Sequence, residues 1–436
     1  MDRERPRMLM ADADGNILDD ERLLMVCRKG DEWRLPARAE MIPLPAESEI
    51  FLLPGRRALG LDPDSGEIQV SENLAVAAFV CPAHTLTAHP AWLADRDAPV
   101  LPLFAYGAVG FADERFYVCA QRVDTDKRQV FANIPPQRIE QGARSLERKY
   151  PRNRLLRHIL DNCVRRYSCP AARNFALGRY EAPLPTSRAC NARCLGCISE
   201  LSDNSPLPAT PQCRLAFTPR PEEVAQIMEI HAAREKRHPI FSFGQGCEGD
   251  PLLNAGLLVQ SMEIYRRNGG KGTINCNTNG SLPGTLPDLA TAGLTSIRVS
   301  LNSARPEQYL KYYRPQGYGF EAVRASLAAA RELGLFTSLN YLFFPGLTDQ
   351  ESELQALTRL VGETGVCMIQ WRNLNIDPQW HLENMGKPAE PAMGLANFMK
   401  RLKKACPWLR YGYFNPWLGE RATLESPPPG QWQQLA

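Results

Sequence analysis

The second half of the chain alternates short apolar runs with longer stretches in which apolar residues recur at helical spacing. The runs, each typical of a buried strand, are 240–243, 273–277, 296–301, 338–344 and 367–371. The helical stretches are 219–234, 252–267, 287–292, 320–334 and one that opens at Thr348-Asp349-Gln350-Glu351, where the pattern fits a capping box. Strands that alternate with helices predict a parallel sheet, whose ligands bind at the carboxyl ends of its strands.

Residues 1–150 show a different pattern, in which strand-like runs rich in branched and aromatic residues are separated by turn-forming residues. The runs are 49–53, 67–70, 74–80 and 116–123. Asp14-Gly15 lies between two short apolar runs and predicts a hairpin. We therefore expect a β-rich N-terminal domain, to which the sequence assigns no role.

The stretch 151–182 connects this domain to the predicted sheet. Residues 153–167 fit an amphipathic helix, with Cys163 on its apolar stripe. Pro170, Pro183 and Pro185 then predict a proline-rich linker. The expected divisions are an N-terminal domain at 1–150, a basic helix and linker at 151–182, a core at 183–375, and a C-terminal extension at 376–436 with one helix near 394–406.

Composition adds constraints on the compartment and on the partners. The chain has 436 residues, of which 44% are apolar and 23% charged, and its net charge of +3 does not favour a polyanionic or membrane partner. The segment Met1–Arg7 is charged, and no apolar run approaches the roughly 20 residues of a membrane helix. We expect a cytoplasmic protein, whose 13 cysteines favour metal or redox chemistry over disulfides.

Three cysteines, Cys190, Cys194 and Cys197, follow a C-x3-C-x2-C spacing. Thiolates this close in sequence can surround one centre, and three of them on a [4Fe–4S] cluster leave one iron open. Arg188 and Arg193 are expected to favour the thiolate forms. A zinc site is the alternative, although the second C-x2-C pair typical of zinc sites is missing from the sequence.

This segment resembles the signature of the radical S-adenosylmethionine (radical SAM) superfamily, except that Gly196 stands where an aromatic residue is frequent. The resemblance implies an α/β fold, a partial (β/α)6 barrel of six parallel strands. It also implies that S-adenosylmethionine binds the open iron and is reductively cleaved to a 5′-deoxyadenosyl radical, which takes hydrogen from a substrate. A reductant such as ferredoxin or flavodoxin is implied as a partner.

Further positions resemble cofactor-binding motifs of the same superfamily. The stretch Gly244–Pro251 resembles its Gly-Gly-Glu-Pro-like motif, which implies that Gly246 and Glu248 approach the methionine amino group. Asp250 is the competing acid, because it directly precedes the proline. The remaining implied contacts are at the ends of two strands: Thr278, Asn279, Ser300 and Asn302.

The sequence leaves the substrate open between a macromolecule, protein or RNA, and a biosynthetic intermediate. The alternative function is a non-catalytic regulatory protein that binds zinc or an iron–sulfur cluster. Residues 144–179 contain ten basic side chains and two acidic ones, which could attract RNA or could simply form a solvated helix face. Cys163 and Cys169 could hold an auxiliary cluster with a third cysteine such as Cys119, although packing explains Cys163 better.

Overall fold

The computed structural model describes residues 5–201 and 205–419. Within these residues the main body is a seven-stranded parallel sheet in the order β13-β14-β15-β16-β17-β18-β19. Its strands are β13 (Glu181–Pro183), β14 (Ile240–Phe243), β15 (Thr273–Thr278), β16 (Ser296–Leu301), β17 (Phe336–Phe343), β18 (Met368–Asn373) and β19 (Arg410–Gly412). Every neighbouring pair is parallel, so all carboxyl ends lie at one edge.

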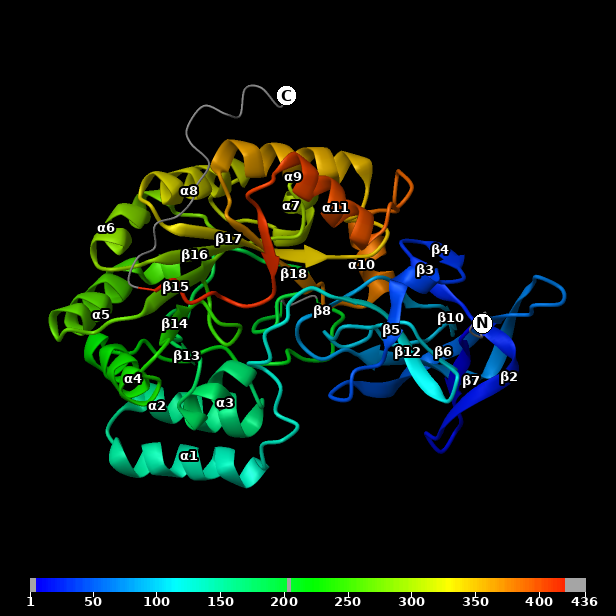
Figure 1. Ribbon diagram of the computed structural model, residues 1–436, viewed down its shortest axis with the longest axis horizontal. Helices are drawn as coiled ribbons and strands as arrows, with labels where there is room; N and C mark the ends of the chain where they lie inside the picture. Colours follow the sequence, from blue (N-terminus) through cyan, green and yellow to red (C-terminus); the bar gives the residue numbers. More distant parts are fainter. Residues whose placement is uncertain (1–4, 202–204, 420–436) are drawn as a thin grey trace.

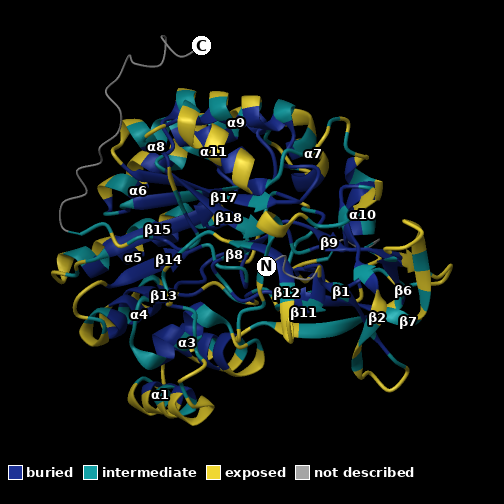
Figure 2. Cartoon of the chain, turned by 45° about the vertical axis from the view of Figure 1, so that its right-hand side comes forward, coloured by how far each residue is buried: buried dark blue, intermediate teal, exposed yellow. Residues whose placement is uncertain are grey.

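Helices cover the outer face of this sheet (Figure 1). They are α4 (Pro221–Arg234), α5 (Ala255–Arg267), α6 (Leu286–Thr291), α7 (Pro306–Tyr313), α8 (Phe320–Glu332), α9 (Glu351–Thr364), α10 (Pro378–Met385) and α11 (Leu395–Ala405), with short turns η3 (Pro251–Asn254) and η4 (Pro283–Thr285). Figure 2 shows the strands buried between these helices, whose exposed residues point outward. The α/β class expected from the sequence is therefore confirmed.

The parallel sheet and its helices differ from the predicted runs in two strands, β13 and β19, and in two helices. The expected count of six strands is wrong, because β19 from the C-terminal part pairs with β18 as a seventh. This strand has only three residues, too few for a periodic pattern. The helices α7 and α10, eight residues each, were also not predicted. Residues 420–436 of the predicted C-terminal extension lie outside the described residues.

The predicted capping box at 348–351 does not form. The helix α9 begins at Glu351 with Gln350 as its N-cap, and no side chain caps it. The Thr348 hydroxyl instead accepts a hydrogen bond from the Phe344 amide at 2.9 Å. Asp349 accepts from the amides of Gly346 and Gly394, so it holds the turn after β17 rather than the helix start.

The N-terminal part forms a nine-stranded antiparallel sheet and a small three-stranded one. The larger contains β1 (Arg7–Ala11), β2 (Ile17–Met25), β5 (Met41–Pro43), β6 (Glu49–Leu61), β7 (Ile68–Phe79), β8 (His84–Leu86), β10 (Trp92–Ala94), β11 (Val109–Ala112) and β12 (Arg115–Arg122). The smaller contains β3 (Cys27–Lys29), β4 (Glu32–Arg34) and β9 (His89–Pro90), and η1 (Arg38–Glu40) precedes β5. The predicted hairpin at Asp14-Gly15 joins β1 and β2.

Between the sheets the chain is helical, which differs from the predicted division. The strands end at Arg122, and residues 136–149 form α1 (Pro136–Lys149) rather than further strands. The stretch predicted as a helix and linker contains α2 (Arg154–His158), a π-helix η2 (Ile159–Arg166) and α3 (Pro170–Leu177). In Figure 1 these helices lie together beside β13 and α4.

The N-terminal sheet is attached to the parallel sheet through β18 and α10. The Arg56 guanidinium forms an ion pair with Asp377 at 2.8 Å, and both side chains are at most 3% exposed. The Thr85 hydroxyl donates to the Trp371 carbonyl at 3.2 Å. The Leu86 amide donates to the Asn373 side-chain oxygen at 2.7 Å. These buried contacts join the two sheets into one body.

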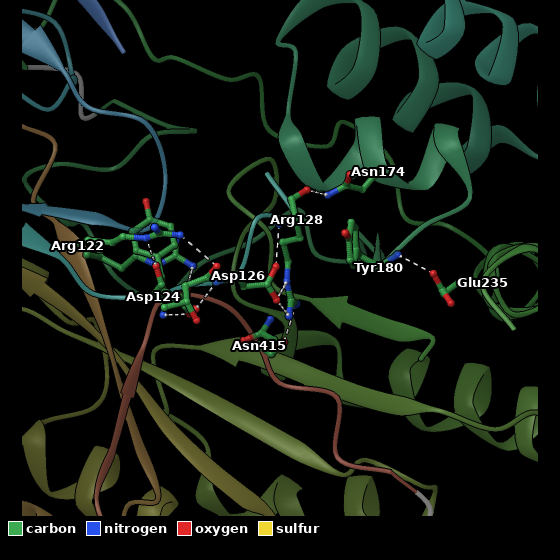
Figure 3. Close-up of polar contacts among 11 residues, drawn as sticks. Arg122, Asp124, Asp126, Arg128, Asn174, Tyr180, Glu235 and Asn415 are labelled. Atoms are coloured by element: carbon green, nitrogen blue, oxygen red, sulfur yellow. Dashed lines mark hydrogen bonds and ion pairs between the residues drawn. The ribbon is translucent and has the colours of Figure 1, made fainter. Parts of the chain in front are cut away.

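The connection from β12 to α1 is held by Arg128 (Figure 3). Its guanidinium binds Asp126 at 2.6 Å and donates to the Asn415 carbonyl at 2.8 Å. The Arg128 carbonyl accepts from the Asn174 side chain of α3 at 2.8 Å. One buried arginine thus connects the N-terminal part, the helices and the C-terminal segment.

Candidate active site

The loop that carries the three cysteines follows β13 and is fixed by backbone contacts on two sides. The amides of Arg193 and Leu195 donate to the carbonyls of Tyr313 and Tyr312, each at 2.9 Å. On the other side, the Asp250 amide donates to the Ala189 carbonyl at 2.9 Å. The loop is therefore held between α7 and the turn after β14.

Gly196 has a physical explanation in this arrangement. A Cβ atom at this position would lie 2.7 Å from the Tyr312 hydroxyl oxygen, so a side chain would displace that ring. Tyr312 is 3% exposed and comes from α7. The Tyr312 ring thus occupies the space beside Gly196. An aromatic residue is frequent at position 196 in the superfamily, and here the aromatic ring comes from α7 instead.

Cys190, Cys194 and Cys197 are partly buried and lie close enough to influence one another. Burial raises the pKa of Cys190 to about 11, and the charges of Asp250 and Cys197 add to this effect. Burial, with the other two sulfurs, also raises the pKa of Cys194. Thiols in this state release protons when they bind a metal. The donor set therefore fits an iron–sulfur cluster.

Arg214 contacts these thiols, which the sequence did not indicate. Its guanidinium lies 3.7 Å from the Cys197 sulfur and 3.2 Å from the Ser199 hydroxyl. The charge of Arg214 lowers the pKa of Cys190, although burial and Asp250 outweigh it. The sequence could not indicate Arg214, because a loop of more than ten residues separates it from the cysteines.

Glu248 is buried after β14, and donors from within the protein surround both of its oxygens. One oxygen accepts from the amides of Thr186 and Ser187 at 2.7 and 2.8 Å. The other accepts from the amides of Gly244 and Gln245 at 2.6 and 3.2 Å. Burial raises the pKa of Glu248 to about 7, although these amides oppose that shift. A carboxylate has about four lone-pair sites that can accept hydrogen bonds, and these contacts occupy all of them.

Asp250 lies nearer the cysteine loop than Glu248 does, and its carboxylate accepts hydrogen bonds from fewer groups. It accepts from the Thr278 hydroxyl at 2.8 Å, from the Asn279 amide at 2.6 Å and from the Leu252 amide at 3.0 Å. Burial raises the pKa of Asp250. Its charge in turn raises the pKa values of Cys190 and Cys194, whereas Glu248 is not among the causes for either thiol.

Thr278 and Asn279 at the end of β15 join this network to the cysteine loop. The Asn279 side chain donates to the Asn191 side-chain oxygen at 2.8 Å, and Asn191 donates to the Ser281 hydroxyl at 3.0 Å. Because Asn191 directly follows Cys190, the end of β15 positions the first cysteine.

Three glycines allow the turn after β14 to approach its neighbours. A Cβ atom on Gly249 would lie 1.9 Å from the Ala189 carbonyl oxygen, and one on Gly244 would lie 1.7 Å from that of Asn277. Gly244 also has a φ of +73°. At Gly246 a Cβ would lie 2.3 Å from the Ile198 side chain, which a small shift could relieve.

Ser300 and Asn302 lie at the carboxyl end of β16. Ser300 is half-buried and accepts from the Asn340 side chain at 3.1 Å. Asn302 donates to the Gln308 carbonyl at 3.3 Å, and its buried side-chain oxygen has no partner within the described residues. All the residues predicted from motifs therefore follow the carboxyl ends of β13–β16.

The inner face of the parallel sheet is polar, which the sequence analysis did not recognise. Arg298 on β16 donates to the Gln370 side chain on β18 at 2.8 Å, and Gln370 donates to Asn415 at 3.0 Å. Arg372 extends over the Tyr413 ring at 3.8 Å. The sequence feature that could have indicated this polar face is the alternation, along β15–β18, of polar residues with buried apolar ones.

The two arginines form the most charged part of this inner face. Both are half-buried, although their neighbours Ile297, Val299 and Trp371 are fully buried. Burial and the charge of Arg372 lower the pKa of Arg298 to about 9. Within the described part of the chain neither forms an ion pair with a carboxylate, and each has a buried Nε without a partner.

Most basic residues in the stretch 144–179 have partners that the sequence did not indicate. Arg165 forms ion pairs with Glu140, Glu147 and Asp161 at 2.6–3.2 Å. Arg154 binds Glu223 at 2.9 Å. Arg154 and Arg165 are therefore paired with carboxylates, some of which lie outside the stretch.

The suggested third cysteine for an auxiliary cluster is wrong. Cys119 packs with Cys27 in the core of the N-terminal part. The side chain that meets Cys163 is instead that of Cys247, with its sulfur 3.7 Å away.

Comparison with known families identifies this arrangement. Residues 184–357 match the family model of the radical SAM superfamily, and this stretch contains the cysteine loop, Glu248, Asp250 and the ends of β15 and β16. This segment is a radical SAM domain. A radical SAM domain is an enzyme domain, and its cofactors are a [4Fe–4S] cluster and S-adenosylmethionine.

Similar proteins cover only part of the chain. Molybdenum cofactor biosynthesis protein 1 of Bos taurus is 30% identical over 180 residues, which is 40% of this chain and 26% of that protein. The GTP 3',8-cyclase of Rhodobacter capsulatus is 26% identical over 166 residues, or 37% of this chain and 44% of that protein. The chain thus matches less than half the length of these relatives.

Among solved structures, methylornithine synthase aligns with a TM-score of 0.37 at 16% identity, over 64% of this chain and 76% of that one. The radical SAM methyltransferase TsrM from Kitasatospora setae aligns with a TM-score of 0.33 at 18% identity, over 44% of this chain and 34% of that one. Separately, none of the helices in the described residues is long and apolar enough to cross a membrane.

Proposed function

We propose that the enzyme cleaves S-adenosylmethionine reductively and uses the resulting 5′-deoxyadenosyl radical to take hydrogen from a substrate on the inner face of the parallel sheet. The observation that supports this best is the cysteine loop, joined through Asn191 and Asn279 to the carboxyl end of β15. When bound, the cluster supplies the electron for this cleavage. The proposal also includes a partial-barrel curvature of the core strands and a reductant such as ferredoxin or flavodoxin.

In this proposal Cys190, Cys194 and Cys197 ligate the cluster, and Asp250 receives the methionine amino group. Asp250 is favoured over Glu248 because its oxygens accept from three groups rather than from four backbone amides and a hydroxyl. Glu248 then acts as a positioning residue, since it binds the amides of Thr186 and Ser187 just before the cysteine loop.

The other predicted positions have supporting roles in the same proposal. Gly246 leaves room beside the cofactor, and Thr278 and Asn279 orient Asp250. Ser300 and the unpartnered Asn302 oxygen suit the ribose hydroxyls, because a buried acceptor without a donor is unfavourable. The N-terminal sheet is proposed as a recognition module for substrate or partner.

For the substrate, the inner face favours a small anion over a macromolecule. Arg298 and Arg372 have unpartnered Nε atoms, and arginine recognises carboxylate and phosphate groups in bidentate geometry. The charge repulsion that lowers the pKa of Arg298 would be relieved by a bound anion. We therefore propose a biosynthetic intermediate that carries a carboxylate or phosphate.

The first experiment measures 5′-deoxyadenosine after anaerobic reconstitution, dithionite reduction and addition of S-adenosylmethionine. Wild type should form it, and the Cys190→Ala/Cys194→Ala/Cys197→Ala variant should form none. Asp250→Asn should weaken cofactor binding by about tenfold or more, because a hydrogen bond to a charged group is worth about 1.5–3 kcal/mol. Absence of 5′-deoxyadenosine from wild type with full iron content would refute the proposal.

Glu248→Gln separates the two acids. The glutamine NH2 group would face backbone N–H donors and could not accept their hydrogen bonds. We therefore expect this variant to lose iron and stability together with any loss of affinity for S-adenosylmethionine. A variant that keeps its cluster but loses affinity for S-adenosylmethionine would return the amino-group role to Glu248.

The substrate class is tested with inorganic pyrophosphate as a probe. It should raise the melting temperature of reconstituted wild type, because a ligand that binds only the native state stabilises it. Arg298→Gln and Arg372→Gln should lose this shift, whereas Arg410→Gln, an exposed residue on β19, should keep it. Equal shifts in all four proteins, or none in wild type, would argue against an anionic substrate at the inner face.

A further inference from the structure

A second group of metal-ligating side chains lies outside the cysteine loop. It contains His158 at the end of α2, Cys163 on the π-helix η2, and Cys247 in the turn after β14. One potential ligand atom from each residue lies within 4.8 Å of the other two. Both cysteines are buried, at 2% and 4% exposure. Two backbone segments, the helical stretch at 154–166 and the turn after β14, thus direct soft ligands to one point.

His158 supplies a second, independent indication of a ligand. Its Nε2 is buried and has no hydrogen-bond partner within the described residues. The Asn162 side-chain nitrogen lies 2.8 Å from Nδ1. A 180° turn of this amide would bring its oxygen to the ring, where it would accept the Nδ1 proton and leave the Nε2 lone pair free, as in the outer shell of a metal-bound histidine.

The sulfur–sulfur distance indicates which kind of metal site this is. The Cys163 and Cys247 sulfurs are 3.7 Å apart. Two thiolates on one tetrahedral zinc ion, with Zn–S bonds of about 2.3 Å, lie about 3.8 Å apart. Thiolates that bind different irons of a cubane are farther apart than this. One imidazole and two thiolates also form the soft donor set that zinc prefers.

The local backbone is unusual at this point. Residues Ile159–Arg166 form a π-helix, and π-helical turns occur frequently at functional sites. The Cys169 amide donates to the Cys163 carbonyl at 2.7 Å across the turn that follows. In that turn Ser168 has a φ of +49°, which is uncommon for a residue other than glycine. This backbone contact fixes the turn that follows the π-helix.

We propose that His158, Cys163 and Cys247 bind one zinc ion, with water as the fourth ligand. The zinc would fasten the turn after β14 to the helices at 154–166. Because Glu248 in that turn binds the backbone just before the cysteine loop, the zinc would stabilise the environment of the radical SAM cluster without ligating it. This inference does not depend on the proposed reaction.

The test uses full-length protein purified anaerobically, with zinc and iron measured by mass spectrometry. Wild type should contain about one zinc and about four irons per chain. His158→Gln and Cys163→Ser should lose the zinc at least about tenfold while keeping the iron, since neither residue belongs to the cysteine loop. Cys367→Ser, which changes a half-buried thiol on the far side of the sheet, is the matched control and should keep both metals.

A second measurement covers the case in which these variants do not fold. The Cys190→Ala/Cys194→Ala/Cys197→Ala protein, freed of metal by a chelator, should bind Co²⁺ with thiolate charge-transfer absorption and tetrahedral d–d bands. The proposal is overturned if wild type holds no zinc and this protein shows no such bands. It is also overturned if Cys163→Ser loses iron instead of zinc, which indicates an auxiliary cluster. Two missing free thiols in denatured wild type would indicate a Cys163–Cys247 disulfide and overturn it equally.

Discussion

At the residue scale, the positions that shape the site are those where backbone segments touch. Gly249 is the sharpest case, because its Cα approaches the Ala189 carbonyl directly before Cys190. Backbone atoms cannot move aside as a flexible side chain can. The sequence motif indicates that a glycine stands here, and the structure explains why no other residue fits.

We expect Gly249→Ala to displace the cysteine loop and reduce the iron bound after reconstitution by at least about half, with a loss of stability of about 2 kcal/mol or more. Gly256→Ala on α5 is the matched control, since nothing lies within 4 Å of the added methyl group. It should retain its iron and gain up to about 1 kcal/mol, because alanine favours a helix. Iron content and urea unfolding check both variants, and full iron retention by Gly249→Ala would contradict the account.

The residue scale also shows where sequence reasoning succeeds and where it ends. Cys190, Cys194 and Cys197 are close in sequence, so their spacing alone indicates shared chemistry. Cys163 and Cys247 are 84 positions apart, and only the tertiary fold brings them together. The helical stripe that contains Cys163 predicts packing, because apolar periodicity does not distinguish a buried thiol from a ligand.

At the element scale, most strands and helices of the core follow from periodicity, and β14 and β16 match the predicted 240–243 and 296–301. The misses share a physical cause, which is that tertiary contacts decide the local structure. The π-helix η2 was predicted as an ordinary helix, because its apolar stripe satisfies both geometries. The strand β19 is three residues long and exists through its pairing with β18.

The start of α4 leads to a pH prediction. Burial alone would raise the pKa of Glu223, but hydrogen bonds from the Arg154 guanidinium and from the amides of Arg220 and Arg154 lower it to about 2. A carboxyl whose pKa is lower in the folded state stabilises the protein above its unfolded pKa, and this stabilisation is lost as the pH falls toward 2.

Glu223→Gln should therefore lower the free energy of unfolding by about 1–3 kcal/mol at pH 7 and by progressively less below about pH 4.5. Urea unfolding at pH 7 and pH 3.5 checks this. Glu222→Gln, the exposed neighbour in the same helical turn, should change little at either pH. A Glu223→Gln effect that is independent of pH would show that the ion pair is not its cause.

The helices at 136–177 lead to a prediction that distinguishes a structural role of Arg165 from a role in RNA binding. Arg165 joins Glu140 and Glu147 of α1 to η2, and its side chain is 29% exposed. Arg165→Ala should cost about 0.5–1 kcal/mol of stability, as expected for partly exposed ion pairs. Filter binding to bulk RNA at low salt should not change. A clear loss of RNA affinity with unchanged stability would restore the docking surface that the sequence suggested.

At the scale of the whole molecule, the sequence indicated the parts but not how they are joined. The radical SAM domain matches residues 184–357, yet segments on both sides of it complete the body. Asn415, in the segment after β19, donates to Glu181 on β13 at 2.9 Å and accepts from Gln370 on β18, which bridges two strands that do not pair. Such contacts leave no local signature, because each partner alone resembles an ordinary polar residue.

The contact between the two sheets depends on a buried ion pair. Arg56 on β6 binds Asp377 at 2.8 Å, and Asp377 also accepts from the amides of Leu101, Gln379 and Trp380. Removing the guanidinium would leave a buried carboxylate without its countercharge. Loss of one partner of a buried pair typically costs about 3–5 kcal/mol.

Arg56→Ala should therefore destabilise the protein by about that amount, roughly 3–5 kcal/mol, and loosen the N-terminal sheet from β18 and α10. Limited proteolysis should cut Arg56→Ala first between the two sheets, in the connection at 123–135, while the core retains its iron. Arg57→Ala is the control, because its ion pair with Asp95 is exposed and worth less than about 1 kcal/mol. Equal proteolysis of both variants would show that the hydrogen bonds from Thr85 and Leu86, rather than the ion pair, hold the two sheets together.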